Sequence, residues 1–143
     1  MVCRLAHVGG LSAACFTFLF GGSLREAAVG FVVGALLKSF TLLLGAIRFN
    51  HFFINLIGAD LAALLALLAV RIGLVPRAEM IIIGSIMLLV PGILIVNSIR
   101  DTLAGDLVAG VARLVEAFIL AGAIAIGSAI VLAMKAFIGR GGL

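Results

Sequence analysis

The sequence predicts an all-α, polytopic membrane protein with a bundle of about five transmembrane helices. Of its 143 residues, 65% are hydrophobic and only 11% are charged. A soluble domain normally has about a quarter charged residues, because its surface must stay hydrated. Apolar blocks recur between short polar breaks, and most approach the roughly 20 helical residues needed to cross a bilayer. Open strands would leave backbone groups unpaired in hydrocarbon, so the blocks are predicted to be helices.

Charged and turn-forming residues set the ends of the helices within a single transmembrane domain, residues 1–143. The helices are predicted at about residues 5–21, 27–47, 52–70, 79–98 and 111–138. A glycine-rich turn at 21–23 ends the first, a break at 48–51 ends the second, and a loop at 71–77 ends the third. The connector at 100–110 precedes the fifth helix. Its apolar positions recur every four residues, as in a helix that lies at the membrane interface.

Composition and spacing exclude several classes of protein. The low charge excludes a soluble enzyme, a disordered segment and a disulfide scaffold. Nucleic-acid binding is not expected despite the net charge of +4, because the basic residues are scattered singly. Cys3 and Cys15 have no metal-ligand pattern and are interpreted as buried or incidental thiols. His7 and His51 lack triad or metal-ligand spacing and are interpreted as interfacial side chains, so catalysis, a metal and a cofactor are not expected.

Two charged residues fall within predicted membrane helices. Asp60 lies near the middle of the third block and Lys38 near the middle of the second. An ionisable group at the bilayer centre costs about 2.5–3.5 kcal/mol on insertion scales and is therefore a functional hypothesis. Asp60 is a candidate substrate or proton site. The alternatives are a structural ion pair between the two residues, or a lysine that reaches towards the headgroups.

The fourth predicted helix contains Pro91 and Gly92. Proline has no amide hydrogen, so the carbonyl of Met87 is expected to lose its helical partner. Transporters use such breaks to place polar groups within the membrane, although a simple packing kink is the alternative. Asn97 and Asp101 follow on one helical face, four residues apart, which favours a functional break.

Charged residues continue through the connector into the fifth helix. Arg113 and Glu116 are three residues apart and are expected to be able to pair. Asp101, Asp106 and Glu116 provide three carboxylates that can serve proton coupling. A solvated loop and a surface ion pair are the alternatives.

Small residues are expected to mediate helix packing. Gly30 and Gly34 form a small-xxx-small pair, which favours packing within the chain over a dimer seam. Small residues also give the fifth helix a surface for close approach: Ala117, Ala121, Gly122, Ala125 and Gly127.

Several of these residues together resemble the threonine/serine exporter family. The similar segments are Leu89-Val90-Pro91-Gly92, Asn97-Ser98-Ile99-Arg100-Asp101, Gly105-Asp106, Gly110, Arg113-Leu114 and Glu116-Ala117, preceded by Phe20-Gly21-Gly22-Ser23. The resemblance covers nearly the whole chain and is most specific between residues 83 and 127. It corresponds to the first membrane half of the family, without the soluble N-terminal region of full-length members.

The resemblance implies transport. Family members export threonine and serine, or small dicarboxylates in a split two-chain form, and use the proton gradient. It implies a second five-helix membrane subunit or a homo-oligomer, a bacterial cytoplasmic membrane, and a cytoplasmic N-terminus by analogy with the soluble region. Asp60, Pro91, Gly92, Asn97, Asp101 and Glu116 are the predicted substrate or proton pathway, with Lys38 and Arg113 as ion-pair partners. A non-transporting scaffold subunit and a small channel are the alternative functions.

Overall fold

The computed structural model describes residues 2–46 and 50–140, and those residues are all-helical with no strand. Its helices are α1 (Val2–Leu19), α2 (Leu24–Ala46), α3 (His51–Arg71), α4 (Glu79–Ile86), α5 (Gly92–Leu103) and α6 (Leu107–Arg140). The predicted all-α class is therefore confirmed. The predicted helix end at residue 47 and part of the following break lie outside the described residues.

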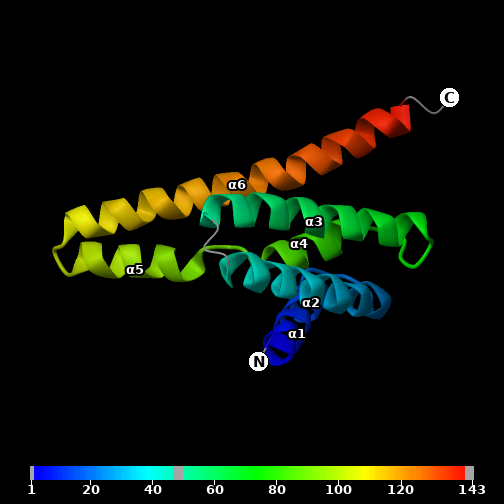
Figure 1. The fold of residues 1–143 in the computed structure, drawn as a ribbon, viewed down its shortest axis with the longest axis horizontal. Helices are drawn as coiled ribbons and strands as arrows, with labels where there is room; N and C mark the ends of the chain where they lie inside the picture. The colour runs from blue at the N-terminus through cyan, green and yellow to red at the C-terminus, as the bar shows by residue number, and fades with distance from the viewer. Residues whose placement is uncertain (1, 47–49, 141–143) are drawn as a thin grey trace.

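The helices form a bundle with a two-helix extension (Figure 1). α2 and the consecutive helices α4 and α5 run in one direction, whereas α3 and α6 run in the other. α1 packs mainly on α2, α4 contacts α1, α2 and α3, and α6 lies against both α3 and α5. α5 and the first half of α6 form a helical hairpin that extends beyond the rest of the bundle.

The predicted count of about five membrane spans is not confirmed. Within the described residues, three helices are long and apolar enough to cross a membrane: 24–46, 51–71 and 107–137. α6 has 34 residues, a length of about 51 Å at 1.5 Å per residue. It is therefore longer than the roughly 30 Å hydrocarbon core of a bilayer.

The helix predicted at 79–98 is two helices in the structure. α4 ends at Ile86, where the amides of Leu88 and Leu89 donate to carbonyls three residues earlier and tighten the chain. Pro91 then caps α5 with a non-helical backbone. Proline carries no amide hydrogen and so cannot continue the series of helical backbone hydrogen bonds. Residues 87–91 therefore separate α4 from α5 as two helices, and there is no single kinked helix.

The connector predicted at 100–110 is likewise mostly helical. α5 continues to Leu103 and α6 begins at Leu107, four residues before its predicted start. Gly105 makes the reversal possible with a φ of 92°, which residues with a side chain rarely adopt. The Asp106 carboxylate then accepts a hydrogen bond from the Ala109 amide at 3.1 Å and so caps the first turn of α6.

Small residues bring α1, α2 and α4 into backbone contact. A Cβ at Gly34 would overlap that of Ala13, and a Cβ at Gly30 would lie 2.7 Å from the Thr17 hydroxyl. Gly84 of α4 approaches the same threonine, and an added Cβ would lie 2.7 Å from its backbone nitrogen. Gly30 and Gly34 thus pack within the chain, as predicted.

The prediction for the fifth helix's small residues holds only in part. Gly127 lies close to α3, where an added Cβ would be 3.2 Å from that of Ala59, and Ala117 is buried. Gly122 has no neighbour within 4 Å of an added Cβ, and Ala121 and Ala125 are exposed. The α3–α6 contact therefore uses one edge of this surface.

We expect Gly34→Val to destabilise the bundle, because its side chain has no room beside Ala13. Overpacking of this kind costs about 1–3 kcal/mol. Gly45→Val is the matched control, since Gly45 lies in the same helix with nothing within 4 Å of an added Cβ. Thermal unfolding in detergent should give a lower Tm for Gly34→Val only, and equal Tm values would contradict the proposed packing.

Candidate functional site

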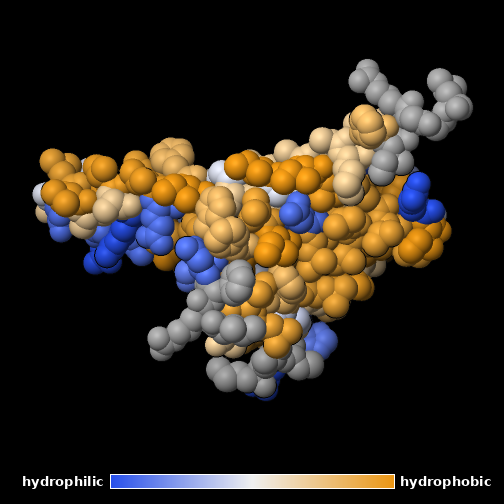
Figure 2. Space-filling model, turned by 45° about the horizontal axis from the view of Figure 1, so that its top comes forward, coloured by the Kyte–Doolittle hydropathy of each residue, from blue (hydrophilic) through white to orange (hydrophobic). Residues whose placement is uncertain are grey.

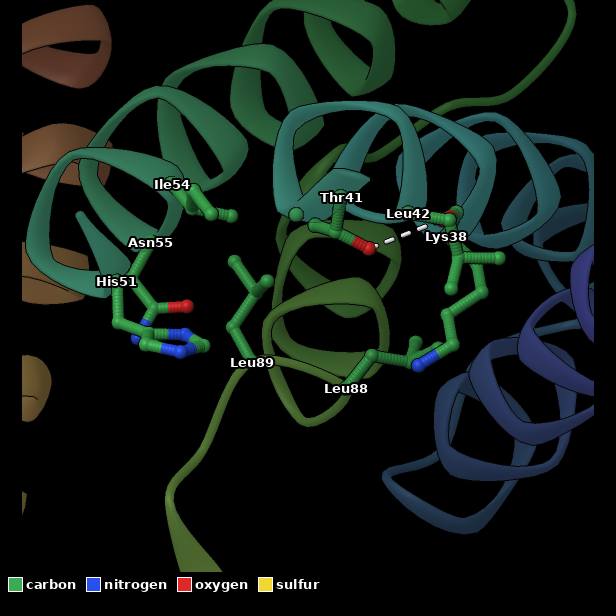
Figure 3. A pocket seen from close by; sticks show the side chains of 9 residues that line it. Lys38, Thr41, Leu42, His51, Ile54, Asn55, Leu88 and Leu89 are labelled. Carbon is green, nitrogen blue, oxygen red and sulfur yellow. Dashed lines mark hydrogen bonds between the residues drawn. The ribbon is translucent and has the colours of Figure 1, made fainter. Parts of the chain in front are cut away.

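A polar pocket lies where α2 ends, α3 begins and the chain leaves α4. It has a volume of about 210 Å³. Its lining residues are Lys38, Thr41, Leu42, Gly45, His51, Ile54, Asn55, Leu88 and Leu89. Figure 3 shows Lys38 and Thr41 on α2 across the pocket from His51 and Asn55 on α3, with Leu88 and Leu89 between them and the end of the Lys38 side chain beside Leu88.

Lys38 is the charged group of this pocket. Its stem lies against α1 at Gly9, where an added Cβ would be 2.6 Å from the lysine Cβ. Leu88 also approaches Gly9, since one of its methyl carbons would lie 3.2 Å from a Cβ added at Gly9. The ammonium group has neither an ion pair nor a hydrogen bond to any described residue. Packing therefore fixes the position of the Lys38 side chain, and its ammonium group is available to bind a ligand.

His51 and Asn55 come from the first turns of α3. They are four residues apart, and residues with this spacing share one face of a helix. The preceding Asn50 fixes the start of α3, because its side chain accepts a hydrogen bond from the Phe52 amide at 3.0 Å. The free amides at a helix N-terminus favour negative charge. This end of α3 and the ammonium of Lys38 are therefore both positive, and together they favour an anionic ligand.

Thr41 adds a hydroxyl group on the α2 side. Its Oγ1 donates to the Lys38 carbonyl at 2.9 Å, so its lone pairs remain free to accept. The described lining residues provide an ammonium, an imidazole, an amide and a hydroxyl, and none of them carries a carboxylate. Such a set suits a small molecule with a carboxylate group, because charge-assisted hydrogen bonds to carboxylates are the strong ones.

Of this set, only Lys38 stands out in the sequence as a candidate functional residue. His51 was interpreted as an interfacial side chain, and Asn55 and Thr41 were not considered. A usable signal existed, since His51 and Asn55 share a helical face. What the sequence did not contain was the approach of α2 to the start of α3.

Asp60 lies deeper in α3 and does not line the pocket. It is half-buried, and its Oδ1 is buried without a hydrogen-bond partner among the described residues. Five residues separate it from Asn55, which turns its side chain about 140° around the helix. The structure accordingly does not pair Asp60 with Lys38.

Pro91 and Gly92 lie directly beyond the pocket. The leucines before them, Leu88 and Leu89, are lining residues, but Pro91 and Gly92 themselves are not. Gly92 starts α5, with nothing within 4 Å of an added Cβ. The two residues thus join the pocket to the hairpin.

The remaining predicted residues lie on the hairpin. Arg113 of α6 pairs with Asp101 of α5 at 2.5 Å, not with Glu116 as the sequence spacing suggested. Ser98 joins the same helices by donating to the Gly110 carbonyl at 2.7 Å. Asn97 is half-buried on α5 and Glu116 is exposed on α6. Hydrophilic residues gather along one side of the hairpin in Figure 2, while its other side is hydrophobic.

The described residues contain no group of three or more histidine, cysteine, aspartate or glutamate side chains that could hold a metal ion. Cys15 is a free, exposed thiol on α1, while the side chain of Cys3 lies outside the described part.

Comparison with known proteins identifies one family. No curated protein and no solved structure gives a significant match. The model of the threonine/serine exporter family, ThrE, matches residues 5–135, which is nearly the whole chain. The helical fold, the apolar spans and this match lead to one conclusion: the chain belongs to the threonine/serine exporter family.

Proposed function

We propose that this chain is half of a secondary transporter that exports small polar metabolites. The observation that supports this proposal most directly concerns the ammonium of Lys38. It lies in a pocket between helices and has no ion-pair partner among the described residues. A membrane protein retains such a charge at a cost, and a ligand that neutralises it during transport explains why it is kept.

The substrate class follows from the donors in the pocket. The carboxylate of the substrate binds Lys38, and His51 and Asn55 orient it from the opposite side. Threonine- or serine-like amino acids and small dicarboxylates share this group, and they are distinguished by the remainder of the molecule. An amino acid also brings an ammonium group, for which the described lining residues offer only neutral acceptors such as the Thr41 hydroxyl.

Proton coupling is assigned to the carboxylates outside the pocket. Asp60 supplies a buried oxygen without a partner, and such a group can gain and lose a proton as its surroundings change. Asp101 and Glu116, with Asn97, continue the polar pathway along the hairpin. Pro91 and Gly92 provide the flexible joint between the pocket and this pathway.

A partner subunit completes the transporter in this proposal. The hairpin presents an apolar side that no other described element covers. Its exposed residues are Ile93, Val96, Ile99 and Leu103 on α5, and Val108, Val111, Val115 and Phe118 on α6. A second five-helix subunit, or a second copy of this chain, would cover this side within a bacterial cytoplasmic membrane. The N-terminus is placed in the cytoplasm by analogy with the family.

We expect Lys38→Gln to reduce efflux of threonine, serine or succinate by about tenfold or more, because a charged hydrogen bond contributes about 1.5–3 kcal/mol. Efflux is measured from vesicles that contain the chain with its partner. Lys135→Gln is the matched control, since Lys135 is an exposed lysine on α6. Unchanged efflux in Lys38→Gln would exclude the pocket as the substrate site. Partner binding without any flux in the native protein would instead support a scaffold.

Asp60→Asn should uncouple transport from the proton gradient, since asparagine cannot carry a proton. Net efflux driven by an imposed pH difference should fall, while exchange of labelled for unlabelled substrate should continue. Asp106→Asn is the control, because asparagine also caps helices well and Asp106 caps α6. The assignment fails if Asp60→Asn still responds to the pH difference, and flux in native vesicles without any gradient-driven accumulation would indicate a channel.

A further inference from the structure

A buried carboxylate lies at the opposite end of the bundle from the pocket. Glu26, in the first turn of α2, is fully buried. Its Oε1 lies 3.7 Å from Nε of Arg77, which belongs to the loop between α3 and α4. We propose that Glu26 and Arg77 form an ion-pair latch that closes this end of the bundle, and that release of the latch opens a path towards the pocket.

Glu26 is held in place by the turn before α2. The Ser23 amide donates to Oε2 of Glu26 at 2.6 Å, and the Glu26 amide donates to the Ser23 hydroxyl at 3.3 Å. This reciprocal pair is a capping box, a Ser followed three residues later by Glu. One carboxylate oxygen is therefore fixed, while Oε1 remains without a hydrogen bond.

The pair is built so that one partner can leave. The side chain of Arg77 is 58% exposed, whereas that of Glu26 is fully buried. The separation of 3.7 Å is an ion pair but too long for a hydrogen bond. Arg77 can thus return to water while Glu26 stays in the turn. The exposure of Arg77 weakens the pair, but loss of Arg77 leaves the buried Glu26 carboxylate without its counter-charge, so the pair favours the closed state.

The latch and the pocket lie at opposite ends of α2. Twelve residues separate Glu26 from Lys38, which is about 18 Å along a helix. In Figure 1 the α3–α4 loop and the start of α2 share one end of the bundle, and the end of α2 and the start of α3 share the other. A transporter that exposes its site alternately needs a closure at each end.

Buried polar groups of α1 and α4 lie between the latch and the pocket. Ser85 of α4 is fully buried, and its hydroxyl has no partner among the described residues. It precedes the pocket residue Leu88 by three positions and follows Arg77 by eight. Thr17, also fully buried, adjoins Gly84. Ser85 is therefore well placed to report whether water enters when the latch opens.

Other charged residues near this end are not part of the latch. Arg25, Arg71 and Glu79 are exposed, and none of them has an ion pair among the described residues. Arg71 ends α3 and provides a matched control for Arg77. The role of the latch in transport rests on the proposed function, whereas its opening can be measured without any substrate.

The test uses Ser85→Cys in a chain whose Cys3 and Cys15 are replaced by serine, reconstituted in vesicles with its partner. A membrane-impermeant maleimide is added from the side of the α3–α4 loop. With the native latch, the thiol introduced by Ser85→Cys should be protected from the maleimide. Arg77→Glu should raise its labelling rate about tenfold, which corresponds to removing roughly 1.4 kcal/mol from the closed state. Arg77→Lys should stay close to native, and Arg71→Glu should have no effect.

Glu26→Gln provides a second variant that keeps the fold. Glutamine can also form the capping box, so only the charge of the latch is lost and labelling should again increase. Equal labelling in Arg77→Glu and Arg71→Glu, or no increase in Glu26→Gln, would overturn the latch. A large fall in Tm for both latch variants would also overturn it, because the pair would then be a structural brace. Lys38→Gln should leave labelling unchanged, so failure of the latch and failure of the pocket are separate results.

Discussion

The contact of α1, α2 and α4 around Thr17 determines where α2 lies, and α2 carries both Glu26 and Lys38. The threonine side chain occupies the space left by Gly30 and Gly84, and its hydroxyl donates to the Ala13 carbonyl at 2.8 Å. In lipid there is no hydrophobic force between helices, so close backbone approach must provide the attraction. Larger residues at these glycines would separate the helices. They would then move both ends of α2.

α2 has two charges within the bundle, Glu26 in its first turn and Lys38 at the pocket, and they differ in what neutralises them. Glu26 has one oxygen fixed by Ser23 and the other near Arg77. Lys38 has its stem packed against Gly9 and its ammonium without a described partner. A charge neutralised within the chain serves structure or closure. A charge that is not neutralised within a pocket can bind a ligand of opposite charge. The transport proposal is therefore based on Lys38.

The sequence predicted the helical class and the packing role of Gly30 and Gly34, and it singled out Lys38 as a charge within a predicted membrane helix, because each depends on local composition. It predicted a break at Pro91 and Gly92 but not that α4 ends as early as Ile86, and it did not predict the pairing of Arg113 with Asp101 across the hairpin, because these depend on contacts between segments. The pocket was missed for the same reason, since His51 faces Lys38 only once α2 and α3 are packed. The Ser23–Glu26 capping box was visible in the sequence. The burial of Glu26 was not.

In the proposed transporter, the hairpin carries part of the polar pathway and also the surface that a partner would cover. α6 is about 51 Å long, so a bilayer with a core of roughly 30 Å cannot cover its whole apolar side when the helix stands upright. The first part of α6 pairs with α5, where Ser98 and Thr102 pack tightly on Gly110. This tight contact keeps the two helices together, so their apolar side persists as one surface. A second subunit that covers it would also lie beside the polar side of the same hairpin, and would thereby enclose the pathway that leads from Lys38.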